Sequence, residues 1–163
     1  MTSSTKDLLI VWHSRTGASR AIAEAAFEQA EGNADLLAAE HVKIEDLLSA
    51  SAYLFVCPEN LASMSGIMKE MFDRTYYPVL GKIEGRPFAT IIAAGSDGEG
   101  AQRQIDRIAK GWRLKRVADR LIIRFDAQSS EAILAAKTVS DANLQQCREL
   151  GAALAEGVRL GVF

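Results

Sequence analysis

The sequence predicts an α/β protein: a three-layer sandwich in which helices cover both faces of a five-stranded parallel sheet of order 2-1-3-4-5. Apolar runs alternate along the chain with stretches of helical periodicity, which is the pattern of strand–helix–strand units. The central apolar runs are nearly continuous, as expected for parallel strands that are covered on both faces. The 163 residues, 48% of them hydrophobic, are expected to form a single domain over residues 1–163.

The strands are expected at the five apolar runs, which are residues 8–12, 36–39, 52–57, 88–94 and 121–125. Helices fill the gaps and the end of the chain, at residues 18–31, 44–48, 65–75, 101–112 and about 140–158. In the first helix, Ile22, Ala26 and Ala30 share one stripe, and Gly32 suits a C-terminal cap. Two connections stand out: residues 76–86 are expected to form a surface loop near the site, and residues 127–130 to be irregular.

Composition excludes several classes of protein. A formal net charge of −2 gives no electrostatic case for binding nucleic acid or an anionic membrane, since both need a basic face. Two cysteines do not make a disulfide framework. The polar first residues do not resemble a secretory signal, and the apolar runs are too short to span a bilayer. We therefore expect a cytoplasmic protein.

The first strand is followed by a turn rich in hydroxyl groups that opens a helix. Its residues are Ser14, Arg15, Thr16, Gly17, Ala18 and Ser19. Backbone N–H groups at the start of a helix lack intrahelical partners, and the helix dipole favours an anion there. The three hydroxyl groups add donors, and Gly17 allows close approach. Neither G-x-x-x-x-G-K-(S/T) nor G-x-G-x-x-G follows this strand, so the turn predicts a site for a terminal monophosphate.

Two further loops follow the third and fourth expected strands. The second loop begins with Pro58, Glu59, Asn60, Leu61 and Ala62, and the third contains Gly95, Ser96, Asp97 and Gly98. In the order 2-1-3-4-5 all three loops surround one crevice at the carboxyl edge of the sheet. Backbone amides and Asn60 suit a polar ring edge, whereas Leu61, Ala62 and Met64 suit the face of a flat ring. Together the three loops predict a mononucleotide with a large planar ring.

These residues resemble a known family. The first loop is similar to the (S/T)-x-(S/T)-G-x-(S/T) phosphate loop of flavodoxins at every specified position. Residues 58–60, 64–66, Lys69 and 72–74 resemble the second loop and helix of flavodoxin-like NAD(P)H-dependent FMN and quinone reductases, and residues 95–100 lie where their third flavin loop lies. The resemblance covers residues 8–125. It implies a flavodoxin-like fold and FMN as the cofactor.

The resemblance also implies an activity and a set of contacts. Electrons would pass from NAD(P)H through FMN to a small-molecule acceptor such as a quinone or another flavin, with no catalytic side chain. The cofactor-binding residues would be Ser14, Arg15, Thr16, Gly17, Ala18, Ser19, Pro58, Glu59, Asn60, Leu61, Ala62, Gly95, Ser96, Asp97 and Gly98. Related reductases are often dimers or tetramers, and residues 76–80 would suit such a contact.

The sequence departs from electron-carrying flavodoxins in two ways. Its second and third loops contain no aromatic residue, and its net charge is close to zero. Both features favour a reductase with one open ring face. A flavodoxin-type electron carrier or redox sensor without turnover, and a domain that has lost the cofactor, remain the alternatives.

Single residues also have simpler interpretations. His13 is expected to be a hydrogen-bonded histidine at a strand end. Cys57 lacks the arginine that a phosphatase nucleophile needs and is expected to be a buried structural thiol. Glu59, Asp97 and Glu99 are a poor metal-ligand set without histidine, so solvation or hydrogen bonding between loops is the expected role.

Overall fold

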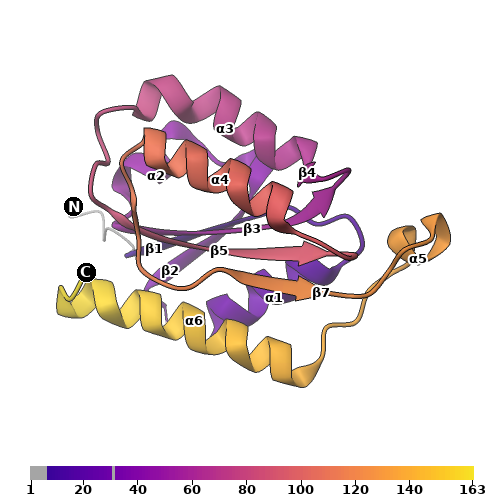
Figure 1. Ribbon diagram of the computed structural model, residues 1–163. Helices are drawn as coiled ribbons and strands as arrows, with labels where there is room; N and C mark the ends of the chain where they lie inside the picture. Colours follow the sequence, from indigo (N-terminus) through magenta and orange to yellow (C-terminus); the bar gives the residue numbers. More distant parts are fainter. Residues whose placement is uncertain (1–6, 31) are drawn as a thin grey trace.

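The computed structural model describes residues 7–30 and 32–163. Its strands are β1 (Leu8–Trp12), β2 (Ala34–Ala38), β3 (Ala52–Asn60), β4 (Ser63–Met64), β5 (Pro87–Ala94), β6 (Lys115–Arg116) and β7 (Leu121–Arg124). Its helices are α1 (Ala18–Glu28), the 3₁₀ turn η1 (Ala39–His41), α2 (Ile44–Ser49), α3 (Gly66–Val79), α4 (Glu99–Gly111), α5 (Ser130–Leu134) and α6 (Asp141–Leu160). Figure 1 shows these elements as three layers.

The sheet confirms the predicted order. The strands run β2-β1-β3-β5, all parallel. The fifth position is divided between two short strands: β6 pairs with the start of β5 and β7 with its end. A short antiparallel strand, β4, folds back on the end of β3. This hairpin was not predicted, because a strand of two residues carries no periodic pattern.

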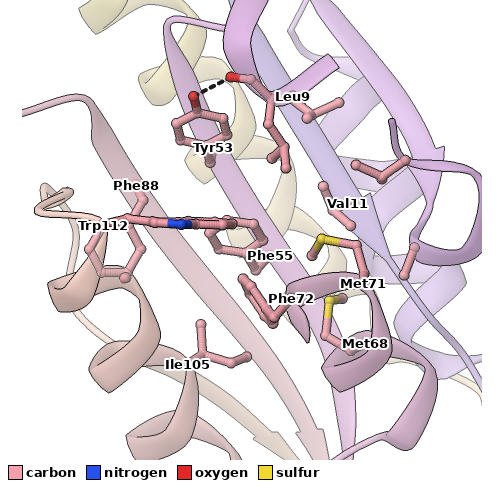
Figure 2. Close-up of a cluster of buried hydrophobic side chains, with 14 of the residues drawn as sticks. Leu9, Val11, Tyr53, Phe55, Met68, Met71, Phe72, Phe88, Ile105 and Trp112 are labelled. Carbon is pink, nitrogen blue, oxygen red and sulfur yellow. Dashed lines mark hydrogen bonds between the residues drawn. The ribbon is translucent and has the colours of Figure 1, made fainter. Parts of the chain in front are cut away.

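Each face of the sheet carries its own apolar core. Figure 1 shows α2, α3 and α4 on one face and α1 and α6 on the other. Under α3 and α4, Phe55 of β3 packs against Phe72, which packs in turn against Trp112, with ring centroids 5.1 Å and 5.6 Å apart (Figure 2). On the other face, alternate strand residues such as Leu54 pack with Ile22 of α1. Side chains that alternate along buried strands supply both cores.

The helices differ from the sequence prediction at their ends. Helix α1 stops at Glu28 and is capped by Gln29. Gly32, with φ +81°, therefore lies in the turn beyond the helix and is not its cap. Glu31, the predicted last residue of α1, lies outside the described residues. Helix α5 was not predicted as a helix, since its five residues are too few to show a helical period.

The prediction that residues 76–86 form a loop near the site is correct only in that residues 80–86 form a loop; it is wrong for residues 76–79 and for the location. Helix α3 continues to Val79, with Pro78 in its last turn. The connection that follows lies at the amino edge of the sheet, where the N–H of Gly85 bonds the carbonyl of Arg113 and the Arg86 guanidinium bonds the carbonyls of Leu48 and Ala50. A crossover helix runs antiparallel to its strands, so its carboxyl end returns to the edge opposite the site.

Candidate functional site

A partly open pocket lies at the carboxyl edge of the sheet. Four chain segments form its wall: the loop after β1, the end of β3, the end of β5 and the segment after β7. Its lining residues are Ser14, Arg15, Thr16, Ala18, Ser19, Pro58, Glu59, Asn60, Ala93, Ala94, Gly95, Phe125, Ala127, Ile133 and Lys137. The site therefore lies where ligands bind in open parallel sheets.

The loop after β1 leads into an α1 N-terminus without a side-chain cap. Its N-cap residue is Gly17, with φ +94°, a left-handed conformation that costs a residue with a Cβ. The N–H of Gly17 bonds Ser14 Oγ at 3.1 Å. Ser19 is 1% exposed, and its hydroxyl has no hydrogen-bond partner among residues 7–30 and 32–163. An unpaired buried hydroxyl is costly, so the loop is suited to a ligand that pairs with it.

The neighbouring helix, α4, has its N-terminus closed by the protein itself. Its N-cap residue, Gly98, has φ +88°. The N–H groups of Gly98 and Ala101 both bond the Glu59 carboxylate, at 2.9 and 3.0 Å. Glu59 thus joins the second loop to the third, as the sequence predicted for its hydrogen-bonding role. A carboxylate at this position also complements the helix dipole.

Nine of the fifteen predicted binding residues line the pocket, and six do not. The six are Gly17, Leu61, Ala62, Ser96, Asp97 and Gly98. Leu61 and Ala62 form the β3–β4 turn, both with positive φ, and Leu61 is fully exposed. The carbonyls of Ser96 and Asp97 accept hydrogen bonds from Arg124. Direct contact of all fifteen residues with a cofactor stays a prediction.

Met64 is not available to a ring. It is 2% exposed and belongs to the core under α3 and α4. The prediction that it offers an apolar surface to a flat ring is therefore wrong. The β3–β4 hairpin is the reason, because it turns the Met64 side chain towards the core.

Sequence reasoning missed six residues of the pocket wall: Ala93, Ala94, Phe125, Ala127, Ile133 and Lys137. The two alanines continue β5 to the edge of the pocket, and the strand pattern was the signal for them. Of the other four, Phe125 directly follows β7, Ile133 lies in the short helix α5, and Ala127 and Lys137 lie in irregular chain. They reach the pocket because the chain crosses from β7 to α6 over the loop after β1, where the N–H of Lys137 bonds the Thr16 carbonyl at 3.0 Å.

Two titratable groups beside the pocket have structural roles. His13 Nδ1 lies 2.8 Å from Ser65 Oγ, which links the start of the phosphate loop to the start of α3. Burial lowers the pKa of His13, with a weaker opposing effect from Glu40. Cys57 is fully buried, and its burial raises the pKa of the thiol to about 12, so it is not a reactive thiolate at neutral pH. Across residues 7–30 and 32–163, no group of three potential metal ligands comes together.

Comparisons with known proteins agree with this architecture. The model of the family described as NADPH-dependent FMN reductase matches residues 27–114. No curated protein matches the sequence significantly. In the part of the chain that the structure describes, no helix is long and apolar enough to cross a membrane.

Solved structures show the same fold. A flavodoxin from the domain Archaea is 23% identical with a TM-score of 0.77, over 94% of this chain and 99% of that one. A WrbA-like flavodoxin from Agrobacterium tumefaciens is 19% identical with a TM-score of 0.68, over 95% and 98%. The flavodiiron protein from Giardia intestinalis is 17% identical with a TM-score of 0.74, over 95% of this chain and 36% of that one.

Proposed function

Since the chain belongs to the NADPH-dependent FMN reductase family and is a flavin-binding redox protein, we propose that it carries electrons from NAD(P)H through FMN to a quinone, flavin or similar small acceptor. The family match, which begins at residue 27, does not include the phosphate loop. The case for FMN in this pocket therefore depends on the geometry of the loop itself.

The hydroxyl of Ser19 is the observation that carries the proposal. It is buried at the first turn of α1, lines the pocket and has no partner within residues 7–30 and 32–163. The first N–H groups of α1 also lack intrahelical acceptors, because no helical turn precedes them. A phosphate oxygen would satisfy both the hydroxyl and these amides, and the helix dipole would favour its charge.

The charges that line the pocket also fit a phosphate. Arg15 and Lys137 are its cationic residues, and Glu59 is its acidic residue. Both oxygens of Glu59 accept hydrogen bonds from the start of α4. The carboxylate is thereby held at the N-terminus of α4, so it repels an anion at α1 less than a free acid would.

The flavin supplies the hydride and electron chemistry when it is bound. The chain supplies binding and positioning: the α1 loop for the phosphate, and Pro58, Asn60 and Gly95 as the neighbouring wall. Neither His13 nor Cys57 lines the pocket, which agrees with a site that needs no nucleophile or general base. We place no catalytic side chain.

Titration of flavin-free protein with FMN tests the proposal. We expect Ser19→Ala to weaken FMN binding by about tenfold through the loss of one charge-assisted hydrogen bond. The same variant should unfold at an unchanged or slightly higher temperature, because an unpaired buried hydroxyl has been removed. Ser140→Ala is the matched control: Ser140 caps α6 through the N–H of Asn143, so its loss should lower stability and leave FMN binding unchanged.

The electron donor is tested with the FMN-loaded protein without oxygen. NADH or NADPH should bleach the flavin absorbance, and added quinone should restore it. Protein that binds no FMN would overturn the proposal. FMN-loaded protein that neither nicotinamide reduces would instead support an electron carrier without turnover of its own.

A further inference from the structure

We infer that residues 125–137 form a fourth wall of the cofactor pocket that retains FMN, with Phe125 and Ile133 as its apolar contacts. This inference rests on the proposed function. The segment contributes Phe125, Ala127, Ile133 and Lys137 to the pocket lining. It lies after residue 114, where the family match ends, and outside the three loops predicted from the sequence.

Both ends of the segment are fastened to predicted cofactor loops. At its start, the N–H of Ala127 bonds the carbonyl of Gly95 at 2.9 Å, next to β5. At its end, the N–H of Lys137 bonds the carbonyl of Thr16 at 3.0 Å. The segment therefore bridges the third loop and the phosphate loop across the pocket.

The backbone is shaped for this crossing. Asp126 has φ +52°, a left-handed conformation that is uncommon outside glycine and redirects the chain as it leaves β7. A Cβ at Gly95 would lie 2.7 Å from the carbonyl oxygen of Ala127. Gly95 therefore permits the segment to approach β5. Gly95, which the sequence predicted as a cofactor-binding residue, lines the pocket and is also in close contact with the fourth wall.

Helix α5 has apolar side chains that the protein leaves uncovered. None of its five residues, all of which the structure describes, is buried. Ile133 is 43% exposed and lines the pocket, whereas its neighbour Leu134 is 57% exposed and does not. The Lys137 ammonium holds the end of this helix through the carbonyls of Ala132, Ile133 and Ala135, at 2.5, 3.2 and 2.7 Å. An apolar side chain at the pocket edge, on backbone held in this way, is suited to cover a bound ligand.

This wall also supplies an aromatic side chain, which the second and third loops lack. The second and third loops contain no aromatic residue. The pocket's lining residues, all of them described, include one aromatic side chain, Phe125, which follows β7 directly. The N–H of Phe125 bonds the carbonyl of Ala94 at 2.9 Å, so its backbone is held at the sheet edge. Apolar contact that other loops would supply is thus available from this segment.

Two variants on adjacent positions test the inference. Flavin-free wild type, Ile133→Ser and Leu134→Ser are each titrated with FMN, and the release of FMN is timed by the recovery of its fluorescence. We expect Ile133→Ser to weaken binding about tenfold, mainly through faster release, because buried apolar area is lost. Leu134→Ser makes the same chemical change in the same helix outside the pocket, and should bind FMN within about twofold of wild type.

A second measurement uses the wild-type protein alone. FMN should slow hydrogen exchange of the amides in residues 125–137, in addition to those of the phosphate loop. Wild type that binds FMN, with Ile133→Ser indistinguishable from Leu134→Ser or with residues 125–137 unprotected, would overturn this inference and leave the proposed function standing. Wild type that binds no FMN would overturn the proposed function itself.

Discussion

Two of the helix N-termini at the carboxyl edge of the sheet, those of α1 and α4, differ in what pairs with their N–H groups. Both α1 and α4 begin after a strand and have a left-handed glycine as N-cap, Gly17 with φ +94° and ψ −17°, and Gly98 with φ +88° and ψ −15°. At α4 the Glu59 carboxylate accepts hydrogen bonds from two amides. At α1 no acidic residue occupies the first turn, and the Ser19 hydroxyl lacks a partner among the described residues.

The difference shows how one local structure serves two purposes. A strand, a glycine turn and a helix always create a site that attracts an anion. Where the chain supplies the anion from its own Glu59, the turn becomes part of the scaffold. Where it supplies none, as at α1, the turn remains suited to a ligand. The backbone at the starts of α1 and α4 is nearly the same. The two turns differ because the Glu59 side chain, from strand β3, pairs with the N–H groups of α4 only.

The largest effect on FMN binding is expected from placing a carboxylate at the N-terminus of α1, where α4 has that of Glu59. Gly17→Asp would place a carboxylate at the phosphate loop, and a Cβ there meets no atom within 4 Å. We expect FMN binding to weaken by about 100-fold or more, because a negative charge would oppose the phosphate at short range. Titration of flavin-free protein, together with circular dichroism to show that the fold is kept, measures this.

Gly17→Asn is the matched control for that variant. Asparagine has the size of aspartate, tolerates the left-handed conformation similarly and carries no charge. It should therefore lose only a small part of the FMN affinity. Equal losses in the two variants would show that backbone strain, and not charge, is responsible.

A smaller effect is expected from removing the cap of α4. Glu59→Ala leaves the N–H groups of Gly98 and Ala101 without their carboxylate, so the free energy of unfolding should fall by about 2 kcal/mol. Urea unfolding measures the loss. The control is Glu24→Ala, which removes an exposed ion pair with Arg20 and should cost less than about 0.5 kcal/mol. A comparable cost in both variants would contradict the scaffold role of Glu59.

The smallest effect concerns pH at the start of the phosphate loop. Burial lowers the pKa of His13 below 6.5 in the folded protein, so the unfolded chain takes up a proton first as pH falls. Stability should be unaffected above pH 7 and should decline as pH falls below 6.5. Thermal unfolding of wild type and His13→Asn between pH 8 and 5 measures this. Parallel pH profiles would show that His13 does not contribute.

The sequence predicted much of the sheet because each main strand is an apolar run with its own turn signals. Residues 8–12 were predicted to the residue. The third strand extends three residues beyond its predicted end, and the fourth begins one residue before its predicted start. The second strand, predicted at residues 36–39, lies at Ala34–Ala38. The hydroxyl-rich turn after β1 was equally visible, since hydroxyl groups around Gly17 form a local pattern; its binding of a phosphate stays a prediction. By contrast, the β3–β4 hairpin and helix α5 were missed, because both are too short for periodicity to identify.

The sequence by itself determined the main strands, the two covered faces and the hydroxyl-rich helix start around Gly17, because each depends on patterns within a few consecutive residues. The sheet order was predicted from the fold class that these patterns indicate. Only the tertiary structure decided what each loop does at the edge. In the folded protein the Glu59 carboxylate binds the N-terminus of α4, and the Met64 side chain packs into the core. Residues 125–137 cross over the loop after β1. These outcomes depend on contacts between segments far apart in the sequence, which no local pattern encodes.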